Sequence, residues 1–183
     1  IAGSWRANAR SCKAAGAMSA SAPPPRRTIA LVGLMGVGKS SIGRRLAHAL
    51  GLPFKDADTV IEEAAGCTIP EIFEKYGEAS FRDGERRVIS RLLDDPPHVL
   101  ATGGGAFVNE QTRALIKDKA LSIWLKTDLA VLARRVARKD NRPLLVGRDP
   151  LTVLQEQAEA RYSAYAEADV TIETGDTPHM HTV

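Results

Sequence analysis

The sequence is poor in residues that cross-link or anchor a protein, and each shortage excludes a class of protein. Its 183 residues include only two cysteines, Cys12 and Cys67, which are too few for a disulfide framework or a cysteine metal site. The four histidines stand in no motif, so we expect no metal cluster. No apolar run is long enough to span a membrane or to form a secretory signal. We therefore expect a cytoplasmic protein without a membrane partner.

Acidic residues are missing from the first 27 residues, which are rich in alanine, serine and arginine and run into Pro23-Pro24-Pro25. This composition predicts a disordered N-terminal extension over residues 1–27, although an organellar transit peptide shares it. The remaining residues, 28–183, have the size of one domain. A net charge of +3 is too small to indicate a nucleic-acid partner.

One glycine-rich stretch, Gly33-Leu34-Met35-Gly36-Val37-Gly38-Lys39-Ser40, has the spacing and the Lys-Ser ending of a loop that wraps around nucleotide phosphates. An apolar run at 28–32 predicts a buried strand before it, and apolar residues at helical spacing follow over 41–50. The loop therefore ends at a helix N-terminus, where backbone N–H groups and the helix dipole favour phosphate. The residues expected to bind ATP or GTP here are Gly36, Val37, Gly38, Lys39, Ser40 and Ser41.

Two side chains of this loop have predicted chemical roles. Lys39 brings a mobile positive charge to the phosphates, and Ser40 offers its hydroxyl to Mg²⁺. The metal ion bridges the outer phosphates and offsets charge that builds up during phosphoryl transfer. The alternative, a glycine-rich turn with a surface lysine, is disfavoured because all four fixed positions and both flanks match.

Further apolar runs alternate with helical patterns along the chain. Four of these runs predict strands, at 53–56, 99–102, 121–125 and 170–172. Such alternation predicts an α/β fold in which helices cover both faces of a mostly parallel sheet. Ligands of this fold class bind at the carboxyl ends of the strands, so the segments after the strands should carry function.

The helices between these strands have recognisable start signals. Thr68 and Glu71 predict a capping box for a short helix through Tyr76. A second helix is expected from Phe81 to Leu93, because apolar residues recur there at helical spacing. Thr127 is the expected cap of a helix over 129–138.

The segments after the predicted strands hold polar residues and glycines in a distinctive order. This order consists of Asp56 and Asp58, Phe81-Arg82-Asp83-Gly84-Glu85, Thr102-Gly103-Gly104-Gly105, Arg142-Pro143-Leu144-Leu145 and Arg161-Tyr162-Ser163-Ala164-Tyr165. Together with the loop at 33–40, the order resembles the shikimate kinase family over about residues 28–174.

The resemblance implies a P-loop NTPase fold of the nucleoside-monophosphate-kinase type. This fold is a three-layer sandwich with a five-stranded parallel sheet, and it carries a mobile lid, here at about residues 139–148. The implied reaction uses ATP and Mg²⁺ to phosphorylate the 3-hydroxyl of shikimate, on the chorismate route to aromatic amino acids. The implied partners are ATP and shikimate, and the family is commonly monomeric.

The resemblance also assigns residues on the nucleotide side of the site. Lys39 and Ser40 contact phosphate and Mg²⁺, and Asp56 approaches the metal through water. Arg142 is the arginine of the lid and counts with Lys39 among the catalytic residues. Arg135 matches the family position that stacks on the adenine. An arginine that arrives on lid closure adds positive charge near the transferring phosphoryl group.

On the substrate side, the resemblance makes Asp58 the residue that holds the substrate hydroxyls and a catalytic residue. Arg82 and Arg161 would clamp the shikimate carboxylate, because planar guanidinium groups match a carboxylate well. The ring would lie against the backbone of Gly103, Gly104 and Gly105. Because the transition state of phosphoryl transfer is loose, we expect Asp58 to act mainly by orienting the substrate and to be a possible base.

Each substrate-side residue taken alone has a simpler structural interpretation. Asp58 could cap the helix that follows it, Arg82 could pair with Glu85 on its own helix, and Arg161 could be an exposed helix charge. Only their joint occurrence with the loop at 33–40 favours the functional interpretation. Two other functions stay open on the residues alone: a kinase of another small polyol or acid, and a nucleotide-binding regulator without catalysis.

Overall fold

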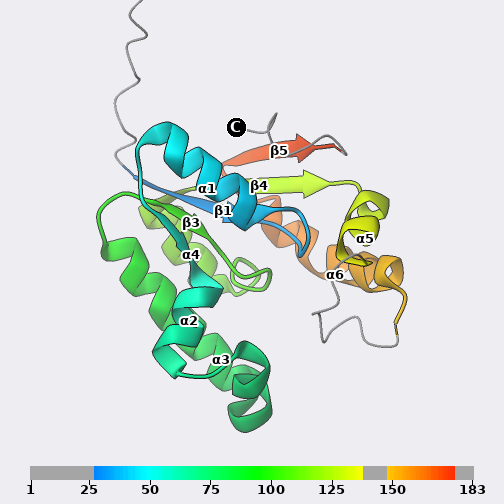
Figure 1. The fold of residues 1–183 in the computed structure, drawn as a ribbon, viewed down its shortest axis with the longest axis horizontal. Coiled ribbons are helices and arrows are strands. Elements are labelled where there is room, and N and C mark those ends of the chain that lie inside the picture. The colour runs from blue at the N-terminus through cyan, green and yellow to red at the C-terminus, as the bar shows by residue number, and fades with distance from the viewer. Residues whose placement is uncertain (1–26, 138–147, 176–183) are drawn as a thin grey trace, which may run out of the picture.

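The computed structural model of the chain describes residues 27–137 and 148–175. Five strands form one parallel sheet in the order β2-β3-β1-β4-β5 (Figure 1). Their bounds are β1 Thr28–Val32, β2 Phe54–Asp56, β3 Val99–Ala101, β4 Ala120–Thr127 and β5 Val170–Thr174. The predicted strands are all present within a few residues of the expected positions, which confirms the five-stranded parallel sheet.

Helices cover the sheet on both faces. In the described ranges they are α1 Lys39–Leu50, α2 Ala57–Ala65, α3 Ile69–Asp94, α4 Glu110–Lys119, α5 Leu129–Ala137 and α6 Pro150–Tyr165. In Figure 1, α1 lies in front of the sheet, α4 and α6 lie behind it, and α2 and the first part of α3 extend past the β2 edge. The predicted three-layer α/β architecture is confirmed.

The central strand β1 is buried along its whole length. It pairs with β3 on one side and β4 on the other, so that Leu31 lies beside Ala101 and Ile123. Because helices cover both faces of the sheet, both faces must be apolar, and the strand therefore reads as an unbroken apolar run. This packing holds the loop that follows β1 at the centre of the carboxyl edge of the sheet.

The helix α3 begins as predicted and then bends. The backbone N–H and the hydroxyl of Thr68 both donate to Glu71 Oε2 at 2.8 Å, which confirms the capping box. The backbone leaves helical geometry at Gly77 (φ 76°, ψ 172°), one residue after the predicted end of the short helix. The second part buries Phe81 and Ile89 against the rest of the protein. This bend separates a projecting first part of α3 from a second part that is anchored in the core.

One predicted helix cap is wrong. Thr127 belongs to β4, and its buried hydroxyl contacts the hydroxyl of Thr174 in β5. The cap of α5 is Asp128, whose Oδ1 accepts two N–H groups of the first helical turn at 2.9 and 3.2 Å. Because β4 extends to residue 127, only the next side chain lies beside the open N–H groups of α5.

Some predicted features fall outside the described residues. They are the disordered extension apart from Arg27, the lid apart from Arg148, and Arg142. Over residues 27–137 and 148–175, no helix combines the length and the apolar character needed to cross a membrane.

Candidate active site

The carboxyl ends of three neighbouring strands carry most of the predicted site. β1 leads into the loop at 33–38, β2 ends at Asp56, and β3 leads into Thr102 and the glycine turn at 103–105. These strands are adjacent and parallel, so the three segments meet at one edge of the sheet. The fold therefore assembles one site from residues that lie far apart in the sequence.

The loop at 33–38 owes its shape to glycine backbone geometry and to one buried anchor. Gly38 is the N-cap of α1 and has a φ of 95°, a left-handed conformation that glycine adopts without strain. A Cβ on Gly36 would lie 2.6 Å from Cγ1 of Val136 in α5, so only glycine allows this close approach. Val37 is fully buried in the core. The loop is thus fixed from both sides with its N–H groups at the start of α1.

The ammonium group of Lys39 lies over this loop. Its Nζ donates to the carbonyl oxygens of Gly33 at 2.8 Å and Leu34 at 3.0 Å. The next two residues, Ser40 and Ser41, continue the first turn of α1, and Ser41 is exposed. A full positive charge and a helix N-terminus thus point to the same place, as an anion such as a nucleotide phosphate requires.

Ser40 and Asp56 bring a hydroxyl and a carboxylate together beside the loop at 33–38. The hydroxyl of Ser40 donates to Asp56 Oδ2 at 2.6 Å, and it links the start of α1 to the end of β2. Hydroxyl and carboxylate oxygens are the donors that Mg²⁺ prefers. The chemistry of these two oxygen donors fits a cation such as Mg²⁺. Among the described residues no group of three or more His, Cys, Asp or Glu could hold a metal ion.

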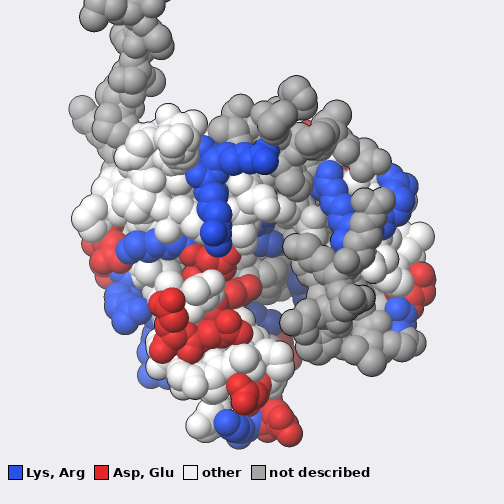
Figure 2. All heavy atoms as spheres, in the orientation of Figure 1, with Lys and Arg blue, Asp and Glu red and all other residues white. Residues whose placement is uncertain are grey.

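Asp56 also decides the position of Asp58. Its Oδ1 accepts the N–H of Asp58 at 3.2 Å, so Asp56 is the N-cap of α2 and the alternative capping role of Asp58 is wrong. Asp58 instead lies in the first turn of α2, where burial first and the charge of Asp56 second raise its pKa to about 6. Acidic side chains gather over α2 and the first part of α3 in Figure 2, and Glu62 of α2 adds to the same shift. The charge of Lys39 opposes this shift, with an influence smaller than that of Asp56 but larger than that of Glu62.

Arg82 is held by two carboxylates of its own helix. Its Nη1 lies 2.8 Å from Oε2 of Glu85, and its Nη2 lies 3.2 Å from Oε1 of Glu78. Glu85 is 1% exposed, and burial raises its pKa, which the guanidinium groups of Arg82 and Arg161 oppose. The interpretation of Arg82 and Glu85 as a pair is confirmed, and the pair positions the guanidinium at the edge of the site.

The glycine turn at 103–105 is where the predicted substrate residues meet. A Cβ on Gly103 would lie 2.8 Å from both Oδ1 of Asp58 and Oε1 of Glu85. The same atom on Gly105 would lie 2.7 Å from Cζ of Arg82, and on Gly104 it would lie 3.1 Å from Nη1 of Arg161. Gly103 therefore leaves room for two charged side chains and the other two glycines for one each, so four side chains surround one short piece of backbone.

Arg135 lies away from this turn, beside the end of β5. Its Nη2 donates to the carbonyl of Gly175 at 2.9 Å, while its buried Nη1 has no hydrogen-bond partner in the described part of the chain. An open cavity of about 460 Å³ lies at the carboxyl ends of β4 and β5, with Thr174 and Gly175 among its lining residues. The predicted contact of Arg135 with adenine stays a prediction.

Two features of the site were not predicted as functional. The rings of Phe73 and Phe81 lie 4.6 Å apart, and Cζ of Arg82 lies 5.1 Å from the Phe81 ring, so an apolar wall adjoins the arginine. The hydroxyl of Tyr165 donates to the carbonyl of Gly104. The sequence motif at 161–165 includes Tyr165, but nothing in it indicates a partner that lies 61 positions earlier.

Comparison with protein families and known sequences gives one consistent result. A family model described as shikimate kinase matches residues 35–183. The chain is 72% identical over 159 residues to a shikimate kinase of Caulobacter vibrioides (strain NA1000 / CB15N), covering 87% of this chain and 80% of that protein. It is 57% identical over 165 residues to a shikimate kinase of Zymomonas mobilis subsp. mobilis, covering 90% and 93%.

Solved structures give the same result. A shikimate kinase from Acinetobacter baumannii, in complex with shikimate, matches with a TM-score of 0.82 and 39% identity, over 87% of this chain and 89% of that chain. A gluconokinase from Sinorhizobium meliloti 1021 matches with a TM-score of 0.57 at 22% identity, over 85% and 86%, which is a likeness of fold alone.

Proposed function

The chain belongs to the shikimate kinase family, so it transfers a phosphoryl group from ATP to a hydroxyl group of shikimate, and we propose how its residues do so. The glycine turn at 103–105 is the floor on which the shikimate ring lies, and the loop at 33–40 binds the phosphates of ATP. The observation that carries this proposal is the convergence of Asp58, Glu85, Arg82 and Arg161 on the three glycines.

The carboxylate of shikimate is bound by Arg82 and Arg161. Two guanidinium forks that reach one carboxylate from different helices would fix both its position and the plane of the ring. The two positive guanidinium groups repel each other, and the buried carboxylate of Glu85 interacts favourably with both. Glu85 thus offsets part of the positive charge and holds Arg82 in place before the substrate binds.

The hydroxyl that accepts the phosphoryl group faces Asp58. With a pKa of about 6, this carboxyl is mostly ionised at neutral pH and accepts a hydrogen bond from the hydroxyl. Its proton affinity is high enough to take up the hydroxyl proton as the new bond to phosphorus forms. Orientation contributes more than proton abstraction, because little bond formation is needed in a loose transition state.

The phosphates of ATP lie on the loop at 33–40. Backbone N–H groups at the start of α1 and the ammonium of Lys39 stabilise their charge. Ser40 and Asp56 would hold Mg²⁺, which, when bound, offsets the charge of the outer phosphates. Asp56 reaches the metal through water in this proposal, as the family resemblance implies, and it also caps α2.

The remaining assignments rest on the family resemblance. Arg142 would add positive charge near the transferring phosphoryl group when the lid at about 139–148 closes, and Arg135 would stack on the adenine. Closure would also exclude water, which competes with shikimate as the acceptor. A monomeric enzyme, as is common in the family, is part of the same proposal. We propose ATP with Mg²⁺ as donor and the shikimate 3-hydroxyl as acceptor.

The test is ADP release by the purified chain with ATP and Mg²⁺, measured with shikimate, with gluconate, with a nucleoside monophosphate and with no acceptor. We expect stimulation by shikimate alone. Phosphorus NMR of the product distinguishes phosphorylation at the 3-hydroxyl from the other two ring positions. Equal stimulation by gluconate would contradict the assigned substrate, and ATP binding without any acceptor phosphorylation would favour the non-catalytic regulator.

A further inference from the structure

Tyr165 is a wholly buried residue at the end of α6 that reaches into the candidate site. It lies one helical turn after Arg161, so both side chains leave the same face of the helix. Its hydroxyl donates to the carbonyl oxygen of Gly104 in the glycine turn. The motif at 161–165 therefore contributes two side chains, and both meet the same glycine.

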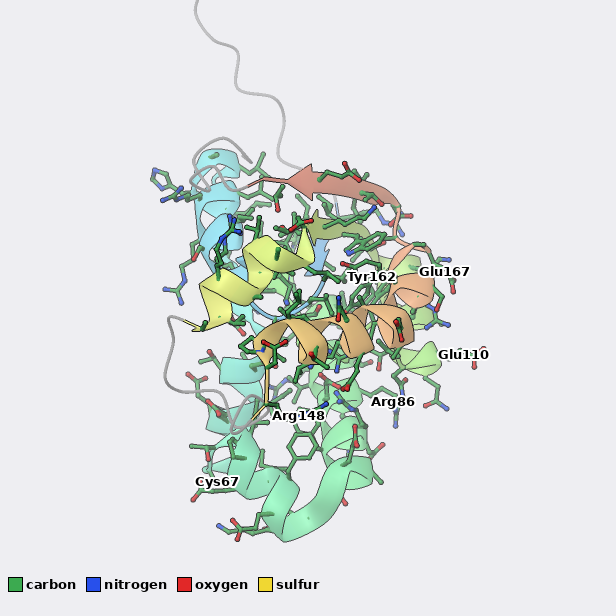
Figure 3. All side chains as sticks on the ribbon, turned by 90° about the vertical axis from the view of Figure 1, so that its right-hand side faces the viewer. Cys67, Arg86, Glu110, Arg148, Tyr162 and Glu167 are labelled. Carbon is green, nitrogen blue, oxygen red and sulfur yellow. The ribbon has the colours of Figure 1, made fainter. Side chains whose placement is uncertain are left out.

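The ring of Tyr165 is fixed by the aromatic residues around it. Its centroid lies 5.9 Å from the ring of Trp124 in β4 and 6.4 Å from that of Tyr162. Figure 3 shows Tyr162 between α6 and the strands, and its ring lies 5.0 Å from Trp124 in an edge arrangement. Because these rings pack against a buried strand, the hydroxyl of Tyr165 has little freedom to move.

We propose that Tyr165 is a positioning residue for the acceptor substrate. The hydroxyl of Tyr165 holds Gly104 against the guanidinium group of Arg161. This inference rests on the proposed role of Arg161 in binding the shikimate carboxylate. The glycine turn has to keep a fixed position relative to Arg161, since the shikimate ring lies on the backbone of the turn while the arginine binds the shikimate carboxylate. The hydrogen bond from Tyr165 sets that position, because Tyr165 and Arg161 lie on the same helix, α6.

The geometry supports such a coupling. A Cβ placed on Gly104 would lie 3.1 Å from Nη1 of Arg161 and 4.0 Å from the hydroxyl of Tyr165, so three groups share one small space. Burial raises the pKa of Tyr165 to about 12, while the charge of Arg161 and a side-chain hydrogen bond with it act in the opposite direction. The phenol therefore stays protonated near neutral pH and keeps donating to the carbonyl of Gly104.

The first test is Tyr165→Phe, which removes the hydroxyl and keeps the ring. We expect KM for shikimate to rise about fivefold to tenfold, as expected when one hydrogen bond that orders the site is lost. KM for ATP and kcat should change less than about twofold. The matched control is Tyr162→Phe, which removes a hydroxyl from the same aromatic cluster and should leave KM for shikimate unchanged.

A double-mutant cycle with Arg161→Lys separates positioning from a structural role. If Tyr165 acts through Arg161, the effect of Tyr165→Phe on KM for shikimate should shrink to less than about twofold in the Arg161→Lys background. Independent effects that multiply would overturn the inference, and so would an unchanged KM in Tyr165→Phe alone. An unchanged KM in Arg161→Lys would instead contradict the proposed clamp, so the two failures can be told apart.

A second variant perturbs the same contact from the other side. Gly104→Ala places a methyl group against Nη1 of Arg161 and leaves Tyr165 intact. If Tyr165→Phe fails to fold, Gly104→Ala takes its place in the cycle, and its effect on KM for shikimate should likewise shrink to less than about twofold in the Arg161→Lys background. Equal increases of KM for shikimate and KM for ATP in Gly104→Ala would overturn the inference.

Discussion

Arg82 and Glu85 form an ion pair in which only the arginine reaches the surface. Nη1 of Arg82 lies 2.8 Å from Oε2 of Glu85, and the two side chains are 27% and 2% exposed. Because Glu85 is buried, water cannot take the place of its carboxylate as the hydrogen-bond partner of Arg82 Nη1. Glu85 therefore fixes the guanidinium at the edge of the glycine turn. Through this ion pair, Glu85 positions Arg82 to bind a negatively charged substrate.

Glu85→Gln should weaken shikimate binding without removing a direct contact to it. The amide keeps the shape of the side chain but loses a charge-assisted hydrogen bond, which contributes about 1.5–3 kcal/mol, so we expect KM for shikimate to rise roughly tenfold or more. Steady-state kinetics with each substrate varied would measure this. Glu78→Gln, on the exposed side of the same arginine, is the control and should change KM less than about twofold.

Arg82→Ala and Arg161→Ala should each raise the dissociation constant of shikimate by roughly tenfold to a hundredfold, because each removes a charged hydrogen bond to the carboxylate. ATP affinity should stay largely intact, since both arginines are assigned to the carboxylate of shikimate and not to the phosphates. Calorimetric titration with each ligand separates the two effects. Arg87→Ala, an exposed arginine of the same helix that pairs with Asp83, serves as the control. An equal loss of ATP and shikimate binding would show that the ATP and shikimate sites have been assigned to the wrong residues.

The pH profile of kcat/KM should report on Asp58. Because its pKa is raised to about 6, the carboxylate is lost as the pH falls through that value, and kcat/KM should fall with it. Asp58→Asn should lower kcat/KM strongly and remove this acidic limb from the residual activity. An acidic limb that persists in the variant would assign the titration to another group.

Asp58 should also make the protein less stable at neutral pH. The folded protein keeps a proton that the unfolded chain releases between pH 3.8 and about 6, so ionisation costs stability as the pH rises through this window. From the size of the shift, Asp58→Asn should raise the free energy of unfolding by about 3 kcal/mol at pH 8 and by much less at pH 4. Chemical denaturation at both pH values measures the difference, and an equal gain at both would show that the charge is not the cause.

His98 should make the fold sensitive to acid. The residue is fully buried, its Nδ1 contacts the carbonyl of Pro96 at 2.9 Å, and its buried Nε2 has no hydrogen-bond partner in the described ranges. Burial lowers its pKa from 6.5, so the unfolded chain binds a proton more readily and stability is lost as the pH falls below that value.

His98→Asn should reduce the loss of stability between pH 7.5 and pH 5.5, as followed by thermal unfolding. A loss of equal size in His98→Asn and the parent protein would rule out His98 as its source.

Local signals predicted most of the fold. A strand buried on both faces, such as β1, needs a continuous apolar run, and a helix needs apolar residues at a period of about 3.6. The phosphate loop was also predictable from a local signal, because its glycines and its Lys-Ser ending lie in one short stretch of the chain and bind the ligand together. The caps of α2 and α5 were less predictable, because the cap depends on the residue at which the preceding strand stops.

The sequence by itself determined the strands, the phosphate loop and the family, since each depends on residues that are close in the chain or on their order along it. Only the tertiary structure decided that Asp56 binds Ser40, that Glu85 reaches Gly103 and that Tyr165 donates to Gly104. These contacts join different elements whose separation is set by how the helices pack on the sheet. No local pattern encodes that distance, because it results from the volumes of all the side chains between them.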